Sequence, residues 1–191
     1  MNKRELLEFI EDKNFQTDEN WYLHATSTNF ENIKKILDEG IKSGYLRNSN
    51  GNHFNGKFYI SLYKNNNENI NLCSWLSDYP KIIINDITPF YADRKKYKLR
   101  RIFINTRIPL RTSEWDGEYQ QYLKIDPSKF VALEYSLSKL LLNSNDSNAK
   151  QKLIFLQDMI IYMEQSNKDL PIYDFSTNRE INKEKVLSLH L

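Results

Sequence analysis

The sequence predicts an α+β domain with a mostly antiparallel sheet and helices on its flanks. Short runs of aromatic and β-branched residues, which are typical of strands, recur between residues 21 and 135. Two other segments, residues 30–41 and 151–164, carry apolar residues at the spacing of a helix face. Polar runs rich in Asn, Ser and Gly separate these segments and indicate loops.

The composition fits one globular domain. A chain of 191 residues is long enough to bury a substantial core, and 40% hydrophobic with 13% aromatic residues is typical of a globular rather than a disordered chain. The formal net charge of +2 points to no particular partner. The single cysteine, Cys73, excludes an internal disulfide and suits a reducing compartment.

Neither a secretory signal nor a membrane span is expected. The first 13 residues carry charges throughout, and no segment approaches the ~18 apolar residues of a membrane-spanning helix. These features lead us to expect a cytoplasmic protein. A secreted effector delivered without a signal peptide would have the same features, so that route stays open.

We expect residues 1–191 to form a single domain with three parts. Residues 20–135 form the core, and residues 149–191 add a helical C-terminal extension. Residues 1–19 are expected to hold an accessory N-terminal helix that packs onto the domain with one apolar side, made of Leu6, Leu7, Phe9 and Ile10.

The stretch from Trp21 to Tyr63 carries the clearest local signals. Trp21 to Leu23 have the residue types of a short strand, and His24 falls where the strand gives way to a helix cap. At the mouth of a strand–helix unit, side chains meet ligands more often than core. His24 is therefore a candidate site residue.

A capped helix follows this strand. Thr28, with Glu31 three residues later, predicts a capping box, and Gly40 predicts the C-terminal stop. The apolar face of this helix consists of Phe30, Ile33, Ile36, Leu37 and Ile41.

The remaining elements are predicted from similar patterns and from turn residues. They are a loop at 48–55, a strand beginning at Tyr59, a strand at 82–84, strands at about 119–125 and 130–135 around a turn at 126–128, a linker at 143–148, a helix at 151–164 and a short helix at 183–189.

The segment from Arg94 to Arg111 is the one strong charge asymmetry. It holds eight basic residues and no acidic one, with apolar residues between them. This pattern predicts one or two strands with a cationic exposed face, which could contact the phosphates of a dinucleotide or of a nucleic acid. A solvated strand face, balanced by acidic residues elsewhere in the fold, would have the same pattern.

The sequence contains no Walker-type loop, no Gly-x-Gly-x-x-Gly and no zinc-ligand spacing, so no metal site is expected. His53 has no second ligand at a metal spacing and reads as an exposed loop residue. With five glycines in all, the chain has little scope for a Gly-lined phosphate cradle. A bound dinucleotide would therefore have to be held by strands and side chains.

Three short motifs occur in a fixed order. The run from His24 to Ser27 ends a strand, and the helix after it closes with Ile36 to Ile41. The run from Gly56 to Ser61 (GKFYIS) begins a later strand, and Glu118 to Tyr122 (EYQQY) precedes the short apolar strand from Phe130 to Leu133. Over residues 20–135 this order resembles the ADP-ribosyltransferases of the diphtheria-toxin and poly(ADP-ribose) polymerase type.

The resemblance implies a split β clamp and NAD as the substrate. It also implies a dispersed triad, in which His24 holds the adenine-side ribose hydroxyl and Tyr59 packs on nicotinamide. Glu118 bonds the 2′-hydroxyl of the nicotinamide-side ribose and stabilises the developing cation, while the backbone of Ala25 binds the nicotinamide amide. Taken singly, each of these residues could instead have only a structural role. Glu114 is the alternative to Glu118 as the catalytic carboxylate.

Secondary candidates for NAD binding are Thr26 and Ser61, which could instead bond the local backbone. The family has a second stacking tyrosine at the position of Ile70, and Trp75 is the residue that could substitute for it. The family glycine after the histidine is Ala25 here.

These residues suit the chemistry. Cleavage of the bond between nicotinamide and its ribose passes through an oxocarbenium-like transition state, as in glycoside hydrolysis. Such a site needs a fixed carboxylate, an aromatic face for nicotinamide and groups that hold the ribose hydroxyls. Glu118, Tyr59 and His24 supply one of each.

The resemblance therefore implies a NAD-dependent mono-ADP-ribosyltransferase, which could act as a toxin or effector, with a protein side chain or a nucleic-acid base as acceptor. The bacterial toxins that modify thymidine in single-stranded DNA are distantly similar, and the basic segment would suit them. Two alternatives stay open. One is an inactive module that binds NAD or ADP-ribose, and the other is a tRNA 2′-phosphotransferase-like enzyme.

Overall fold

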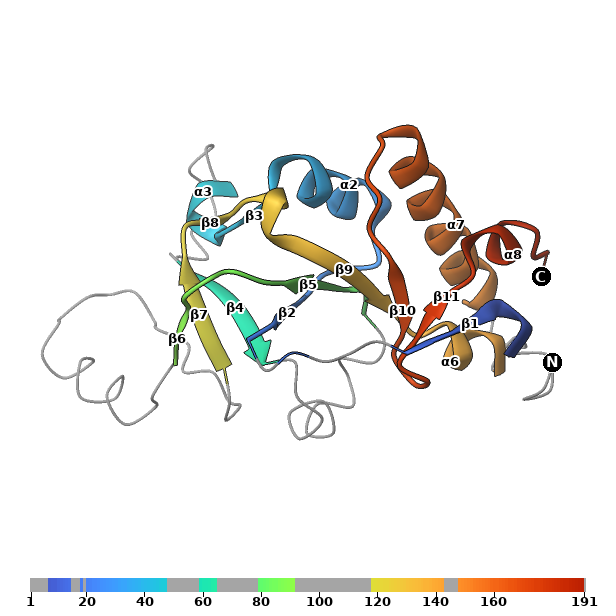
Figure 1. Cartoon of the computed structure of the whole chain (residues 1–191). Helices are drawn as coiled ribbons and strands as arrows, with labels where there is room; N and C mark the ends of the chain where they lie inside the picture. Colours follow the sequence, from blue (N-terminus) through green and yellow to red (C-terminus); the bar gives the residue numbers. More distant parts are fainter. Residues whose placement is uncertain are drawn as a thin grey trace, which may run out of the picture.

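The computed structural model of the chain describes residues 7–14, 18, 20–47, 59–64, 79–91, 118–142 and 148–190. In this part of the chain the main sheet has nine strands in the order β1-β11-β10-β9-β5-β2-β4-β7-β6 (Figure 1). Its neighbouring strands are antiparallel except for the parallel pair β9 and β10. In sheet order, the strands are β1 (Ile10–Asn14), β11 (Arg179–Ile181), β10 (Ile172–Asp174), β9 (Phe130–Tyr135), β5 (Lys81–Ile84), β2 (Tyr22–Ala25), β4 (Tyr59–Lys64), β7 (Glu118–Tyr122) and β6 (Phe90–Tyr91).

A second, two-stranded sheet pairs β3 (Ile41–Lys42) with β8 (Lys124–Ile125). Figure 1 shows α2 and α7 on the same side of the main sheet. The helices are α2 (Phe30–Glu39), α3 (Gly44–Arg47), α6 (Leu137–Leu142), α7 (Ala149–Gln165) and α8 (Lys183–Leu187), with 3-10 turns η1 (Leu7–Phe9) and η3 (Pro127–Lys129). The prediction of a mixed α/β chain with a mostly antiparallel sheet is therefore confirmed.

The core lies on both faces of the sheet. All four residues of β5 are buried, because this strand is central and is covered on both sides. Ile82 and Ile84 belong to the large apolar cluster that includes residues of α2 and α7, whereas Ile83 belongs to a smaller cluster with Leu23, Ala132 and Tyr173. This alternation follows from the two-residue period of a strand.

Helix α2 begins one residue later than the capping box predicts. Asn29 is the N-cap, and its Oδ1 accepts a hydrogen bond from the Asn32 backbone N–H at 3.0 Å. The prediction that Thr28 and Glu31 form a capping box is therefore wrong, since asparagine is an equally good cap and lies one position closer to the helix.

The end of α2 at Gly40 is confirmed. The Gly40 N–H donates to the Ile36 carbonyl at 2.9 Å, and its φ of 87° with ψ of 173° is a conformation that glycine alone adopts readily. Gly40 is buried, and a Cβ there would overlap the carbonyl oxygen of Ile125 in β8. The glycine thus lets the chain leave the helix and enter β3 directly against β8.

The N-terminal helix expected within residues 1–19 is not what the described residues form. Leu7–Phe9 is a single 3-10 turn, and Ile10–Asn14 is strand β1, paired with β11. Ile10 lies opposite Ile181, and both are buried. Pairing with a partner about 170 residues away outweighed the local helical spacing of the apolar residues.

The C-terminal extension is only partly helical. Helices α7 and α8 confirm the two predicted near 151–164 and 183–189. Between them, β10 and β11 form a hairpin that joins the main sheet beside β9. The sequence does not predict these two strands, because they are three residues each and too short for a periodic signal.

A bond between α2 and α7 makes part of the stability depend on pH. Tyr162 Oη donates a hydrogen bond to Asp38 Oδ1, and Lys168 Nζ lies 3.3 Å from the same oxygen. The Tyr162 hydrogen bond is the main cause that holds the pKa of Asp38 below its ordinary value of 3.8; partial burial opposes it and Lys168 assists it. Because the folded-state pKa is lowered, this contribution is present above pH 3.8 and is lost as the pH falls through the folded-state value.

We expect Tyr162→Phe to raise the pKa of Asp38 toward 3.8. Titration of the Asp38 carboxylate by NMR, in the wild type and in the variant, measures this change directly. Tyr162→Phe should also weaken the acid-dependent part of the unfolding free energy. An Asp38 pKa that is the same in both proteins would contradict the assignment of Tyr162 as the main cause.

Candidate functional site

His24 lies inside β2 rather than after it, since the strand continues to Ala25. Its ring is half-buried, and Nδ1 is 3.0 Å from the carbonyl oxygen of Ser61 in β4. A carbonyl oxygen only accepts, so Nδ1 carries the hydrogen and donates it. In the neutral ring, Nε2 is then an acceptor.

This hydrogen bond lies where β2 and β4 stop pairing. The register between the two strands extends over Tyr22 and Leu23, opposite Lys64 and Tyr63. On the other side of β2, pairing with β5 continues as far as Ala25. The sheet therefore loosens on one side of β2, at His24 and Ala25.

The backbone of Ala25 is directed toward this loosened side. Thr26 N–H donates to the Pro80 carbonyl at 3.0 Å, on the β5 side. Because the N–H and C=O groups of successive strand residues point alternately to the two sides, those of Ala25 point to the β4 side. They lie beyond the last residue of β2 whose register with β4 is described.

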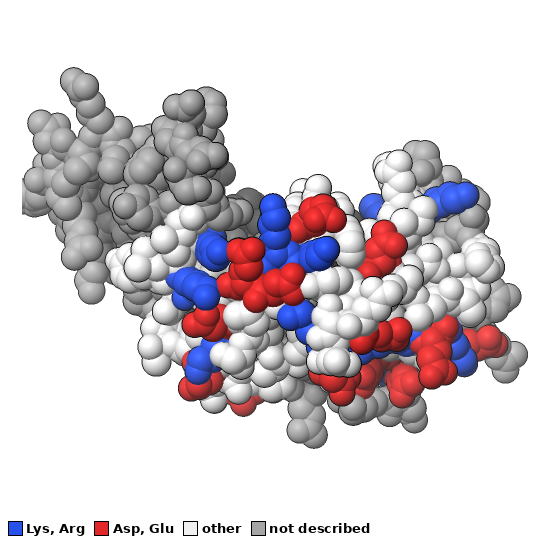
Figure 2. Space-filling view, turned by 90° about the horizontal axis from the view of Figure 1, so that it is seen from above, with Lys and Arg blue, Asp and Glu red and all other residues white. Residues whose placement is uncertain are grey.

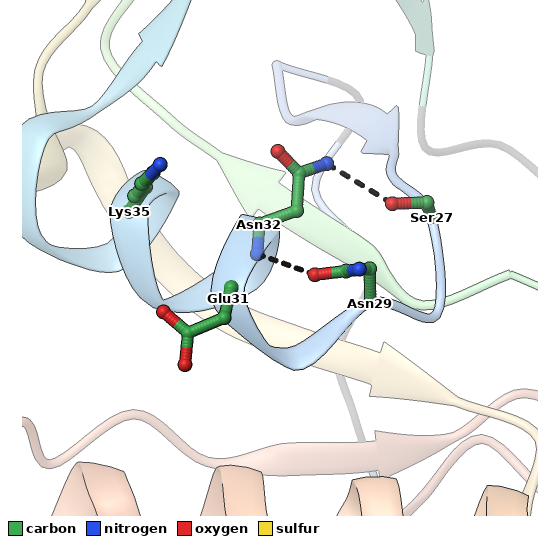
Figure 3. A pocket seen from close by; sticks show the side chains of 5 residues that line it. All are labelled: Ser27, Asn29, Glu31, Asn32 and Lys35. Carbon is green, nitrogen blue, oxygen red and sulfur yellow. Dashed lines mark hydrogen bonds between the residues drawn. The ribbon is translucent and has the colours of Figure 1, made fainter.

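Thr26 is held locally. It is buried, and its Oγ1 accepts a hydrogen bond from Asn32 Nδ2 at 3.4 Å. Asn32 Nδ2 also donates to Ser27 Oγ at 3.0 Å (Figure 3). Both the amide and the hydroxyl of Thr26 thus have partners within the protein, which makes this residue a structural link between β2 and α2.

A shallow polar pocket of about 280 Å³ lies beside this link. Its lining residues come from the β2–α2 connection and from the first two turns of α2, as Figure 3 shows. The side chain of Asn32 points back toward Ser27, across the start of the helix. The predicted site residues His24, Ala25 and Ser61 are not among the lining residues, which are Ser27, Asn29, Glu31, Asn32 and Lys35.

Tyr59 and Glu118 lie on neighbouring strands, and the structure describes their backbone but not their side chains. Glu118 is directly opposite Tyr63, whereas Tyr59 is opposite Tyr122. Tyr59 is thus four positions along β4 from the residue that faces Glu118, roughly 13 Å at 3.3 Å per residue. Ser61 lies midway, opposite Gln120.

Other predicted features fall outside the described residues. These are Trp75, Ile70, Cys73, His53, Glu114 and the whole basic segment from Arg94 to Arg111.

Sequence reasoning did not find Tyr63. This side chain is half-buried against the small cluster that contains Leu23, and it lies opposite both Leu23 and the Glu118 position. The two-residue period of each strand shows which residues share a face, but only the register between strands shows which residues are partners. The register pairs Leu23 with Tyr63 and puts both on one face of the sheet. Neither strand by itself predicts that register.

Sequence reasoning also missed a buried ion pair. Lys81 Nζ lies 2.6 Å from Glu134 Oε1, and the two side chains are 1% and 5% exposed. A lysine at the head of the apolar run Lys81–Ile84 reads as an exposed strand end, so burial was not expected.

Charges of both signs alternate on the face that carries α2 and α7. Figure 2 views the molecule from this side and shows Lys and Arg next to Asp and Glu. Lys124 pairs with Asp126 at 2.6 Å, and Lys42 and Lys129 pair with Glu39 and Asp86. The described residues of this face thus form no continuous cationic surface of the kind that attracts nucleic acid.

No protein-family model, no curated protein and no solved structure matches this chain. Among the described residues, no three His, Cys, Asp or Glu side chains come together in a metal-binding group. No helix in the same part of the chain combines the length and the apolar character that a membrane crossing requires.

Proposed function

We propose that this protein is a NAD-dependent mono-ADP-ribosyltransferase with a protein side chain or a nucleic-acid base as its acceptor. The observation that carries the proposal is the arrangement of β2, β4 and β7. These strands bear His24, Tyr59 and Glu118, are well separated in sequence, and are consecutive neighbours in the sheet. By the two-residue period, the Tyr59 and Glu118 positions share the face of Leu23, and His24 lies on the other face, where β2 and β4 stop pairing. The motif order in the sequence does not by itself require this adjacency.

The loosened edge of β2 suits a carboxamide. Nicotinamide carries one amide C=O and one NH₂ group, and Ala25 directs one N–H and one C=O toward the same side. A planar amide can therefore pair with Ala25 in the manner of an added strand residue. Only the backbone of Ala25 makes this contact, so an alanine in place of the family glycine does not prevent it.

His24 suits a ribose hydroxyl. With Nδ1–H bonded to the Ser61 carbonyl, the ring orientation is fixed, and in the neutral form of the ring Nε2 is a hydrogen-bond acceptor. A ribose hydroxyl is a donor as well as an acceptor, so it complements this nitrogen. Glu118, two strands away, would be the carboxylate that stabilises the oxocarbenium ion as nicotinamide leaves.

Two tyrosines of β4 are candidates for the aromatic face that packs on nicotinamide. Tyr63, rather than Tyr59, is opposite Glu118 in β7 and also opposite Leu23 in β2. Either tyrosine could pack on nicotinamide, and substitution distinguishes them. Tyr59→Phe and Tyr63→Phe keep the ring, whereas the two alanine variants remove it.

The test of the proposal is the release of nicotinamide from NAD. The protein is incubated with NAD alone, with a protein acceptor mixture, with single-stranded DNA and with RNA. Release that depends on one acceptor class would identify that class. NAD binding without release would favour the inactive binding module, and absence of NAD binding would overturn the proposal.

We expect NAD to raise the melting temperature. A ligand that binds only the folded state stabilises it by roughly 2–3 kcal/mol at a hundredfold excess over its Kd. If Tyr59 stacks on nicotinamide, Tyr59→Ala should abolish most of the shift and Tyr59→Phe should leave it nearly unchanged. If only Tyr63→Ala abolishes the shift, Tyr63 supplies the aromatic face. Differential scanning fluorimetry with millimolar NAD or nicotinamide measures all four variants.

A further inference from the structure

The ion pair between Lys81 and Glu134 is nearly excluded from water. The two side chains are 1% and 5% exposed, and their charged atoms are 2.6 Å apart. Lys81 Nζ also lies 4.0 Å from the centre of the Phe175 ring, which follows β10. The ammonium group thus links the head of β5 to β9 and to the turn of the C-terminal hairpin.

Stability alone does not account for this pair. Removing two charges from water costs about as much as their attraction returns, and well-packed apolar residues often replace such a pair without loss. The same face of the sheet carries the apolar residues Leu23, Ile83 and Ala132. Apolar side chains at positions 81 and 134 would therefore continue an existing apolar cluster. Unlike an apolar contact, the pair imposes a definite distance and direction on the groups that it joins.

The pair lies beside the strand end that carries the candidate site. Lys81 is the first residue of β5, and its register partners are Ala25 on one side and Glu134 on the other. The preceding Pro80 carbonyl accepts the Thr26 N–H. Strand ends open more readily than strand centres, so the head of β5 is the part that needs an anchor.

We propose that Lys81 and Glu134 are positioning residues for the NAD site. By anchoring the head of β5 to β9, they hold the Thr26–Pro80 hydrogen bond and so keep the backbone of Ala25 turned toward β4. The identity of the ligand that Ala25 binds rests on the proposed function. The anchoring itself rests only on the contacts of Lys81, Glu134 and Phe175.

The first measurement is amide hydrogen exchange by NMR on the full chain. The double variant Lys81→Met, Glu134→Leu replaces the pair by apolar side chains of similar size. We expect it to unfold at a denaturant midpoint close to that of the wild type, yet to exchange the Thr26 amide about tenfold faster. The Ile84 amide, at the other end of β5, serves as the internal control and should keep its rate.

A second variant covers the case in which the double variant does not fold. Phe175→Leu keeps both charges and removes the ring beside the ammonium group. We expect a two- to threefold faster exchange at Thr26, again without change at Ile84. Thr26 exchange at the wild-type rate in the variants that fold would overturn the proposal, whatever the result with NAD.

The second measurement is the Kd of nicotinamide and of NAD by calorimetry. In the double variant we expect both Kd values to rise about tenfold, although the unfolding midpoint is retained. Faster Thr26 exchange with unchanged Kd values would overturn the role in ligand positioning. Faster exchange in a protein whose wild type binds neither ligand would instead leave the anchoring intact and remove the proposed function.

Discussion

Glu118→Gln is expected to lower the rate of nicotinamide release by about 10²-fold or more while changing NAD affinity little. A carboxylate beside an oxocarbenium ion acts mainly in the transition state, because the full positive charge on the ribose develops only there. Glutamine keeps the shape of the side chain and removes its charge. The rate constant of release under saturating NAD and the Kd of NAD together measure the effect.

Glu114→Gln is the matched control, since it removes the same charge four residues earlier in the sequence. It should cost little in release rate. If Glu114→Gln abolishes release and Glu118→Gln does not, the catalytic carboxylate lies before β7 rather than at its first residue. If neither change matters, the protein is not an enzyme of this type and the NAD-binding module becomes the better account. Near-wild-type unfolding of both variants ensures that the comparison concerns chemistry.

Gly40→Ala is expected to lower the free energy of unfolding by about 3 kcal/mol. Two penalties add at this position. The backbone conformation, with φ of 87° and ψ of 173°, disfavours any residue with a side chain, and the new methyl group would overlap the Ile125 carbonyl oxygen. Neither the α2 end nor β8 can move freely, because Ile41 pairs with Ile125 immediately afterwards. Urea unfolding followed by circular dichroism gives the value.

Gly40→Asn tests whether the backbone conformation at this position is the one described. Asparagine tolerates the left-handed helical region, which has ψ near 47°, but the ψ of 173° at Gly40 lies far from it. The asparagine variant should therefore be as unstable as the alanine variant. Lys35→Ala, at an exposed position of the same helix, is the control and should change the unfolding free energy by no more than about 0.5 kcal/mol. An asparagine variant close to wild type would show that the end of α2 rearranges.

The strongest local signals of the sequence determined several elements correctly. The all-isoleucine run became β5, the aromatic runs at 59–64 and 130–135 became β4 and β9, and the apolar segment before residue 165 became α7. Gly40 was recognised as the end of α2 because few residues other than glycine adopt a positive φ. In each case the information is local, since periodicity, propensity and turn chemistry act within a few residues.

Other local readings were wrong where two outcomes differ little in energy. Thr28 and Asn29 are both good N-caps, and in the structure Asn29 takes this position, with its side chain accepting from the Asn32 N–H. The apolar residues near the N-terminus have helical spacing, but the described ones form a turn and a strand. Their partner is β11, and pairing with it buries Ile10.

For the candidate site too, some features follow from the sequence and others only from the tertiary structure. From sequence alone came the residue types that the chemistry needs, His24 and Glu118 among them, and their order along the chain. Only the tertiary structure decided that their strands are neighbours, that pairing between β2 and β4 ends beside His24, and that Tyr63 rather than Tyr59 faces the Glu118 position. The burial of Lys81 against Glu134 is likewise evident only from the tertiary structure. Register between strands is set by contacts that join distant segments, and a one-residue shift would exchange the two faces of a strand. No pattern within a single segment contains that information.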